Sequence, residues 1–399
     1  MTLPFIDTSA PAGPPRAQGV NLRALLEEMV SRNASDLHIV AAERPKLRVD
    51  GDIVNSSVEY EMTPKDTLQL AYSVLTEQQK KRFELEDELD FSFGIQNLAR
   101  FRGNVFKQRG CVSMVVRQIP FAIKTFDQLG LPGAIAKMAE KPRGLVLVTG
   151  PTGSGKSTTL AAMIDKINRE RKGHIITVED PIEFIHKHQG CIINQREVGS
   201  DTKTFANALK YALREDPDVI LVGEMRDLET IAAALTIAET GHLVFATLHT
   251  NSAAEAINRI IDVFPSHQQS QVRAQLAFVL EGIVTQTLLP KAQGKGRVMA
   301  AEILVVTPAI RALVRDDKIH QIYSTMQASK KFGMQTLNDA LYQLYMNREV
   351  TVDECLRVSG DPVEFQRMIG QLDPADDPNK IGGKPAAARG PVSGAPTKR

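Results

Sequence analysis

The fold is decided by the stretch LVLVTGPTGSGKS, which runs from Leu145 to Ser157. Its first four residues are all apolar, as in a short β-strand buried on both faces. The residues from Gly150 to Ser157 follow at once and match the pattern G-x-x-x-x-G-K-S. A stretch typical of a helix, from Thr158 to about Asn168, comes next. A strand, a glycine-rich loop and a helix in this order are typical of a P-loop, whose backbone N–H groups hold phosphates.

The chemistry of this loop points to ATP with Mg²⁺. Glycines let backbone N–H groups approach phosphate oxygens that a side chain would block, and the helix N-terminus adds partial positive charge. Lys156 is expected to reach the β- and γ-phosphates, and the Ser157 hydroxyl to bind the metal. A plain glycine-rich turn is the alternative, which the flanking strand and helix disfavour. The predicted nucleotide-binding residues are Gly150, Pro151, Thr152, Gly153, Ser154, Gly155, Lys156, Ser157 and Thr158.

Three more short apolar runs follow the loop, at 175–178, 219–222 and 243–246. They alternate with stretches typical of helices, which indicates a parallel sheet covered on both faces. After Leu289-Pro290 the sequence is mostly typical of helices to about Leu372. We therefore predict an α/β fold with a RecA-like P-loop NTPase core over residues 131–372.

A smaller α+β domain is predicted before this core, over residues 20–119. Asn21 is a helix cap, and apolar residues on one helical face follow it. Thr63-Pro64 opens another helix, which we expect to run to about Phe83, and Asp50-Gly51 is typical of a hairpin turn. The expected strands are 37–40, 47–49, 53–54, 91–93, 101–106 and 112–119.

Composition and the ends of the chain narrow the function classes. Among 399 residues, 48 are basic and 47 acidic, so the net charge of +1 gives no general attraction to nucleic acid or anionic lipid. The three cysteines lie far apart and predict neither a zinc knuckle nor a disulfide framework. No apolar run approaches the ~18–20 residues that span a bilayer, and no signal peptide is apparent. We expect a linker at 120–130, disordered tails at 1–19 and 373–399, and a membrane role only through a partner.

Glu224 is the predicted catalytic base. It follows the apolar strand 219–222 and so lies at the carboxyl end of a parallel strand, where open α/β sheets bind ligands. The usual aspartate of a Walker B strand is replaced here by Gly223, so Glu224 is the carboxylate at that strand tip. It is also predicted to help hold the metal. A solvated glutamate at a helix start is the alternative.

A second acidic cluster, Glu179, Asp180 and Glu183, follows the strand 175–178. Carboxylates beside a triphosphate repel one another unless a metal or an arginine lies among them. We interpret Glu179 and Glu183 as groups that position the metal and the attacking water, so the predicted metal positions are Ser157, Glu183 and Glu224. An acidic helix start is the alternative. His249, at the end of the strand 243–246, is predicted to sense the γ-phosphate, although a structural histidine is equally consistent with the pattern.

Arginines that stabilise charge on a transferring phosphoryl group are needed as well. Arg102 and Arg117 lie on neighbouring predicted strands of the first domain and would act in trans if an adjacent subunit presented that domain to the nucleotide. Arg259, on the helix after His249, is a further candidate. Solvated surface arginines are the alternative for all three.

Four motifs now resemble one family, the secretion ATPase superfamily, and within it the PilT-type retraction ATPases of type IV pili. They are the Walker A loop 150–157, the acidic stretch 176–184, the atypical Walker B stretch 222–227 and the histidine stretch 241–251. The segment 34–39 is similar to the start of the family's PAS-like N-terminal domain. The resemblance covers about residues 20–372. The stretches Ala309–Asp316 and Gly333–Leu337 resemble the retraction class, with Asp316 where glutamate is common.

The resemblance implies a ring-shaped homohexamer with ATP between subunits, and it supports the roles given above to Glu224, Glu179, Glu183, His249, Arg102 and Arg117. It implies a cytoplasmic motor at the inner-membrane face that acts on a pilus platform protein and retracts the pilus by depolymerising pilin, as in twitching motility. Assembly and type II secretion relatives usually carry an extra N-terminal domain and a four-cysteine zinc insert, and this chain has neither. Three alternatives stay open: a pilus-assembly or secretion ATPase, an accessory subunit that binds a second retraction ATPase, and a nucleic-acid motor. The absence of tryptophan, the 5% aromatic content and the near-zero net charge disfavour the last.

Overall fold

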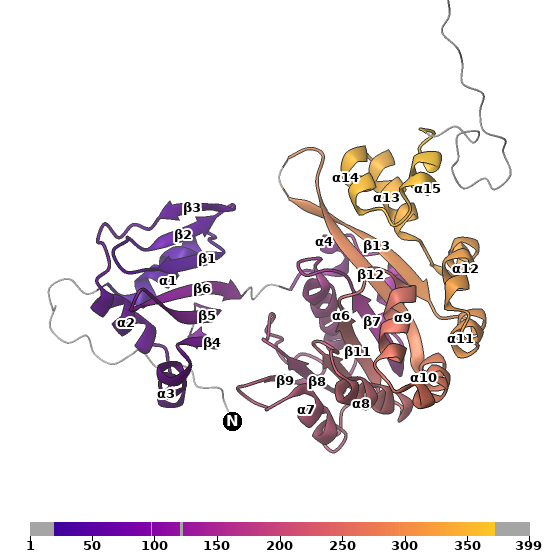
Figure 1. Cartoon of the computed structure of the whole chain (residues 1–399), viewed down its shortest axis with the longest axis horizontal. Coiled ribbons are helices and arrows are strands. Elements are labelled where there is room, and N and C mark those ends of the chain that lie inside the picture. Colours follow the sequence, from indigo (N-terminus) through magenta and orange to yellow (C-terminus); the bar gives the residue numbers. More distant parts are fainter. Residues whose placement is uncertain (1–19, 97, 120–122, 295, 372–399) are drawn as a thin grey trace, which may run out of the picture.

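The computed structural model describes residues 20–96, 98–119, 123–294 and 296–371. Each of its two sheets forms the centre of a separate domain (Figure 1). The predicted tails, 1–19 and 373–399, lie outside the described residues. Within the predicted linker, Thr125 caps the single helical turn α4 (Phe126–Leu129), while 120–122 lie outside the described part.

The N-terminal domain is built on a six-stranded antiparallel sheet in the order β3-β2-β1-β6-β5-β4. Side chains along its strands alternate between a core face and an outer face, since successive residues of a strand point to opposite sides. On β5, Phe101 and Val105 are fully buried, whereas Arg100 and Arg102 lie on the other face. The strands are β1 (Asp36–Ile39), β2 (Lys46–Val49), β3 (Asp52–Asn55), β4 (Glu88–Ile95), β5 (Ala99–Gln108) and β6 (Cys111–Ile119).

Three helices pack their apolar side chains against the core face of this sheet. They are α1 (Leu22–Ser31), α2 (Pro64–Tyr72) and α3 (Glu77–Glu86). The prediction of one helix from Pro64 to Phe83 is wrong, because two helices occupy that stretch. Thr76 forms a capping box with Gln79, in which each backbone N–H donates to the other's side chain. This satisfies the free donors of a new helix start, so α3 begins at Glu77 instead of continuing α2.

The second domain contains a seven-stranded sheet in the order β13-β12-β7-β11-β10-β8-β9. All neighbouring strands are parallel except β13, which pairs antiparallel with β12. The apolar runs expected to be strands form its middle, which confirms the α/β prediction. The strands are β7 (Gly144–Thr149), β8 (His174–Glu179), β9 (Ile192–Glu197), β10 (Val219–Val222), β11 (Leu243–Leu248), β12 (Leu280–Pro290) and β13 (Arg297–Val305).

Helices cover both faces of this sheet and enclose a separate apolar core on each side. One face is covered by α5 (Gly133–Ala139) and α6 (Lys156–Glu170). The other is covered by α7 (Phe205–Ala212), α8 (Leu228–Glu239), α9 (Ala253–Asp262), α10 (Ser266–Val279), α11 (Pro308–Arg315) and α12 (Ile322–Ala328). Burial on both faces explains why β7, β10 and β11 consist almost wholly of apolar residues.

The helical expectation after Leu289-Pro290 is wrong for β13, and the sequence did not reveal β9 or β12 as strands. Polar residues interrupt the apolar pattern of both: Thr285, Gln286 and Thr287 in β12, and Asn194, Gln195 and Arg196 in β9. In the fold most of these side chains find hydrogen-bond partners on neighbouring segments, so the tertiary structure supplies what the local pattern lacks. The side chains with such partners are Thr285, Gln286, Asn194, Gln195 and Arg196.

The last helices of the described chain form a small helical subdomain on the hairpin of β12 and β13 (Figure 1). It consists of α13 (Leu337–Met346), α14 (Val352–Val358) and α15 (Pro362–Met368), which share an apolar core with Leu289 and Ala300. Among the described residues, none of the helices has the length and apolar character needed to cross a membrane.

Candidate active site

The P-loop connects β7 to α6, and its glycines are required by geometry. Gly150 has φ 136°, and a Cβ there would lie 2.2 Å from the backbone oxygen of Gln286. Gly155 caps α6 with φ 92°, a left-handed conformation that other residues rarely adopt. The loop therefore turns tightly at both ends, and α6 begins at Lys156 with its N-terminus at the pocket.

Strand β12 holds the P-loop from beneath. The Gln286 side chain donates from Nε2 to the backbone oxygen of Ser154, at 2.8 Å. The hydroxyls of Thr149 and Thr285 lie 2.8 Å apart at the start of the loop. All of these polar side chains are buried, so their contacts replace water and fix the loop against the sheet. No local pattern in the sequence indicates this support, because it depends on the pairing of β12 with β7.

The Lys156 side chain contacts the backbone of the P-loop itself. Its Nζ donates to the backbone oxygens of Gly150, at 2.8 Å, and Pro151, at 3.1 Å, and lies 3.5 Å from Nδ1 of His249. Burial lowers the pKa of Lys156, and the nearby charges of Glu224 and Glu183 oppose that shift. The ammonium group is therefore held where the P-loop, the histidine and both acidic strand ends meet.

Glu224 follows β10, as expected, and its side chain is held by Arg226 and His249. Arg226 donates to it from both Nε and Nη2, at 2.6 and 2.7 Å, and Nε2 of His249 lies 3.3 Å from Glu224 Oε1. Burial raises the pKa of Glu224. The hydrogen bond from Arg226 and the charges of His249 and Arg226 outweigh that effect and leave the pKa below its ordinary value. Glu224 is thus ionised at neutral pH, as a general base must be.

Gly223 has a steric reason for replacing the usual aspartate. A Cβ at this position would lie 3.1 Å from both the Cα of Glu179 and the backbone oxygen of Val178. The backbone around it is fixed by Thr247, whose hydroxyl donates to the Gly223 oxygen at 2.5 Å. A side chain at 223 would therefore press on the end of β8, and the missing glycine side chain leaves room for Glu179.

The segment Glu179–Glu183, here called the acidic loop, holds two carboxylates in different environments. Glu179 is enclosed: its carboxylate accepts from the Thr177 hydroxyl at 2.6 Å, from Gln195 Nε2 at 3.2 Å and from the Glu183 backbone. Burial raises the pKa of Glu179 to about 7 despite these donors. Glu183 is exposed and lies near enough to Lys156 to affect that lysine's pKa. Sequence reasoning treated the two as alike, and the fold separates them.

These groups line one cavity of about 400 Å³. Most predicted site residues contribute to it: Thr152, Gly153, Gly155, Lys156, Ser157, Thr158, Glu179, Glu183, Glu224 and His249. Gly150, Pro151 and Ser154 form the frame of the loop instead of the lining. Four charged or aromatic lining residues were missed by sequence reasoning: Phe184, Phe205, Arg226 and Arg297. Arg226 stood inside the Walker B stretch, two residues after Glu224, and could have been found from that spacing.

The three predicted arginines do not line the pocket of their own chain. Arg102 and Arg117 are directly opposite each other on β5 and β6. Their side chains are 43% and 66% exposed, and they contact Asp90 and Asp36 of the same domain at 3.7 and 2.8 Å. Arg259 is exposed on α9. A role for Arg102 and Arg117 in trans remains a prediction.

The lining fits a nucleotide with its metal. The glycine positions leave space where a Cβ would collide with the loop's own support, and Lys156 supplies a cation for phosphate oxygens. Among the described residues, no group of three or more His, Cys, Asp and Glu side chains could hold a metal by itself. The lining includes the Ser157 hydroxyl and the Glu183 carboxylate, and such oxygens are the protein ligands that Mg²⁺ takes beside phosphates and waters.

Comparison with known proteins decides the family. The family model described as "Type II/IV secretion system protein" matches residues 19–357. The chain belongs to this secretion family. Within the family, it is 50% identical to the type IV pilus retraction ATPase PilT of Pseudomonas aeruginosa over 322 residues, which is 81% of this chain and 93% of that protein. It is 44% identical to the type IV pilus ATPase PilU of the same organism over 345 residues, or 86% and 90% of the two chains.

Solved structures of family members agree with this. The crystal structure of the pilus retraction motor PilT with bound ADP has a TM-score of 0.83 and 50% identity, and the match covers 87% of this chain and 99% of that one. The ATPase DotB of Legionella pneumophila has a TM-score of 0.72 at 26% identity, with 87% and 97% covered. The resemblance to retraction ATPases and the P-loop ATPase fold are thereby confirmed, and this secretion-family chain is a nucleotide-binding ATPase. The likeness of its N-terminal domain to a PAS domain stays a prediction.

Proposed function

We propose that this protein is a subunit of a homohexameric ring that hydrolyses ATP with Mg²⁺ to retract type IV pili. The observation that carries the proposal is the arrangement around Lys156. The P-loop, the base Glu224, the acidic loop and His249 all meet at one cavity, while the arginines expected to complete it are on the exposed face of the other domain. A ring in which each N-terminal domain faces a neighbour's cavity would bring the two halves together.

The residues of the cavity have distinct roles in this proposal. Lys156 exchanges its carbonyl partners for phosphate oxygens, and the P-loop N–H groups and the α6 N-terminus bind the same anion. Glu224 orients the attacking water and accepts its proton. His249 lies between Lys156 and Glu224 and reports on the phosphate by contacting both. Ser157 and Glu183 would hold the metal, which would supply Lewis-acid stabilisation of phosphate charge.

Arg102 and Arg117 would act on a neighbouring subunit's nucleotide. They form a cross-strand pair on the outer face of the N-terminal sheet, and both side chains reach solvent. Each has an acidic partner, Asp90 or Asp36, which a phosphate would displace. The Arg102–Asp90 pair is exposed on both sides, so its release would cost little, about 0–1 kcal/mol. Asp36 is buried, so the release of Arg117 would cost more. It would leave that carboxylate with Ser35 and Arg48 as partners.

Retraction is favoured over assembly by the comparisons. Identity is 50% to PilT and 48% to the twitching motility protein of Neisseria gonorrhoeae, against 31% to the type II secretion protein E of Xanthomonas campestris, of which the match covers 67%. We propose that the ring acts at the cytoplasmic face of the inner membrane, through a platform protein of the pilus machinery.

The phenotype of a clean deletion tests the direction of work. A retraction motor predicts cells that carry surface pili, in normal or excess number, but do not twitch. Bald cells would instead identify an assembly ATPase and overturn the proposal. Pilus counts by electron microscopy and twitching zones on agar are the two measurements.

An accessory role is the second candidate, because the chain is also 44% identical to PilU. In that case a second retraction ATPase would supply the hydrolysis. Complementing the deletion with a Lys156→Ala copy separates the two. Restored twitching supports the accessory subunit, and absent twitching with stable protein supports the motor.

A further inference from the structure

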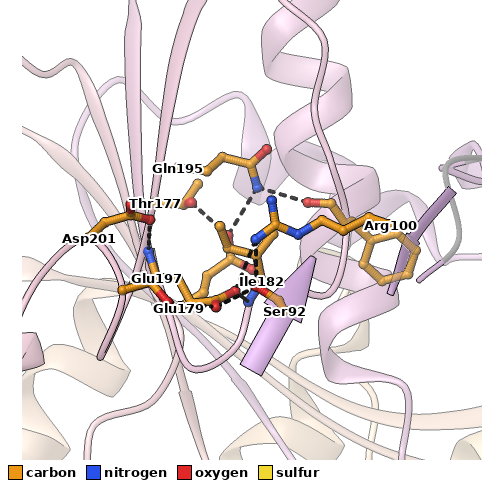
Figure 2. A network of polar contacts seen from close by, with 10 residues as sticks. Ser92, Arg100, Thr177, Glu179, Ile182, Gln195, Glu197 and Asp201 are labelled. Carbon is orange, nitrogen blue, oxygen red and sulfur yellow. Dashed lines mark hydrogen bonds and ion pairs between the residues drawn. The ribbon is translucent and has the colours of Figure 1, made fainter. Parts of the chain in front are cut away.

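Glu197 is a buried carboxylate that does not line the cavity, yet it contacts both domains (Figure 2). It ends β9, and its side chain is 5% exposed. Oε1 accepts from the hydroxyls of Ser92, at 2.7 Å, and Ser200, at 3.3 Å. Oε2 accepts from the backbone N–H of Ile182, at 3.1 Å, and from Nη2 of Arg100, at 3.3 Å. A carboxylate removed from water needs donors of this kind.

One of these contacts leads to the acidic loop. Ile182 lies between Glu179 and Glu183, so its N–H bond to Glu197 fixes the middle of the loop. Gln195, two residues earlier on β9, donates to Glu179 at 3.2 Å and to the Phe184 backbone oxygen at 2.8 Å. Glu179 and Glu197 are also register partners at the ends of β8 and β9. The edge strand β9 therefore holds the acidic loop along its length.

The other contacts lead to the N-terminal domain of the same chain. Ser92 is on β4 and Arg100 on β5, and Arg100 Nη2 donates to the Ser92 hydroxyl at 2.8 Å as well as to Glu197. Arg100 is 14% exposed, and its Nε is buried without a hydrogen-bond partner among the described residues. The pair thus lacks the bidentate geometry that makes Arg–carboxylate contacts strongest, and it is a contact that domain movement can break.

Breaking it has a consequence for the loop. Within the described part of the chain, Arg100 is the cation recorded in ion-pair contact with Glu197. Removing the partner of a buried charge is unfavourable, because the remaining charge must find water, a proton or other donors. Each of these responses changes how Glu197 accepts from Ile182. The placement of the N-terminal domain and the placement of the acidic loop are therefore linked through one carboxylate.

We propose that Glu197 is a positioning residue for the acidic loop, and that Ser92 and Arg100 make its hold on the loop depend on the N-terminal domain of the same chain. The inference rests on the proposed roles of Glu179 and Glu183 in hydrolysis. Arg100 and Arg102 share the outer face of β5, so one strand contacts Glu197, which holds its own chain's acidic loop, and presents Arg102 toward a neighbour. A change at one nucleotide site would then be transmitted to the next site through this strand.

The test compares Arg100→Gln and Glu197→Gln with Arg82→Gln in the full-length protein. Arg82 is a matched control, because it pairs with Glu86 on the exposed surface of the same domain.

Two quantities are measured: ATPase kinetics, and amide hydrogen exchange of peptides covering residues 180–185. We expect Arg100→Gln and Glu197→Gln each to lower kcat by about tenfold with little change in KM and to speed amide exchange in that segment. The double variant should be no slower than Glu197→Gln alone, since the two residues act in series. Arg82→Gln should change neither quantity.

Separate outcomes address the relay and the proposed function. The proposed link from Arg100 through Glu197 to the acidic loop is overturned if Arg100→Gln leaves amide exchange at 180–185 unchanged. It is also overturned if the double variant loses kcat by the product of the two single losses. Faster exchange with an unchanged kcat overturns the positioning role, provided that Glu183→Gln is itself impaired. If Glu183→Gln keeps full activity, the proposed role of the acidic loop in hydrolysis fails. The exchange data would still test whether Arg100 and Glu197 hold the loop. Arg100→Lys, which retains the charge, should recover part of the lost kcat and part of the exchange protection.

Discussion

The two domains contribute to catalysis in opposite ways. In the ATPase domain the functional groups are inward and mutually bonded: Lys156, His249 and Glu224 form a continuous chain of contacts in one cavity. On the N-terminal sheet the arginines are divided. Arg100 is buried against its own ATPase domain, whereas Arg102 and Arg117 are exposed.

This difference indicates a division of labour. In the proposed mechanism the ATPase domain is preorganised to bind a phosphate and activate water, so it would need little rearrangement of its own. The N-terminal domain carries charges whose effect depends on where the domain lies, and a movable domain is what a motor requires. Substitutions in one domain or the other should therefore affect hydrolysis in different ways.

The largest loss of kcat is expected from a substitution in the ATPase domain. Glu224→Gln removes the proposed base while preserving the size of the side chain and the approach of Arg226, so kcat should fall by up to about 10⁴-fold. Nucleotide affinity should be nearly unchanged, because Lys156 and the P-loop are intact. Steady-state ATPase assays and titration with a fluorescent nucleotide measure the two quantities. Glu229→Gln, an exposed glutamate on α8, is the control. A Glu224→Gln protein that hydrolyses ATP normally would remove Glu224 from the mechanism.

The next largest loss of kcat is expected from the exposed arginines of the N-terminal domain. The double variant Arg102→Ala/Arg117→Ala should lose about 10³-fold in kcat, the usual worth of arginine fingers. Mixing this inactive protein with the inactive Glu224→Gln protein should recover activity, because some interfaces in mixed rings join an intact cavity to intact arginines. If mixing restores nothing although subunits exchange, the arginines do not act in trans.

A smaller effect concerns the pH dependence of stability at Glu179. Its pKa is raised to about 7 in the fold from 4.5, so between these values the folded state keeps a proton that the unfolded state has lost. Stability should therefore fall as the pH rises from 4.5 to 7 and then level off, by about 3 kcal/mol in total. Glu179→Gln should lack this component. Thermal unfolding at pH 5 and pH 8 measures the difference, and equal pH profiles for both proteins would contradict the assignment.

The smallest effect is expected at Gly223. Gly223→Ala introduces a Cβ 3.1 Å from the backbone at Glu179, which should cost about 1–2 kcal/mol of stability through overpacking. Gly133→Ala is the matched control, since a Cβ at Gly133 would meet nothing within 4 Å. Thermal unfolding of the two variants provides the measurement. A neutral Gly223→Ala variant would show that the end of β8 can move.

Local chemistry in the sequence determined much of this protein. The apolar run 145–148, the glycine loop and the helix after it predicted the P-loop, because each depends on neighbouring residues alone. The order of short apolar strands predicted the parallel middle of the sheet, and hence that Glu179, Glu224 and His249 end near one another. Asn21 was predicted as a helix cap and Thr63-Pro64 as a helix start for the same reason, since these signals act within a few residues of themselves.

The tertiary structure decided what depends on distant partners. Strand β12 carries buried polar residues that make sense only because Thr149 and Ser154 lie beside them. The different states of Glu179 and Glu183 follow from burial, which no local pattern records. Arg100 and Arg102 look alike in the sequence, and only domain packing buries the first against Glu197 and leaves the second exposed. A sequence specifies which charges exist, but the fold sets the distance and the solvent that determine what each charge does.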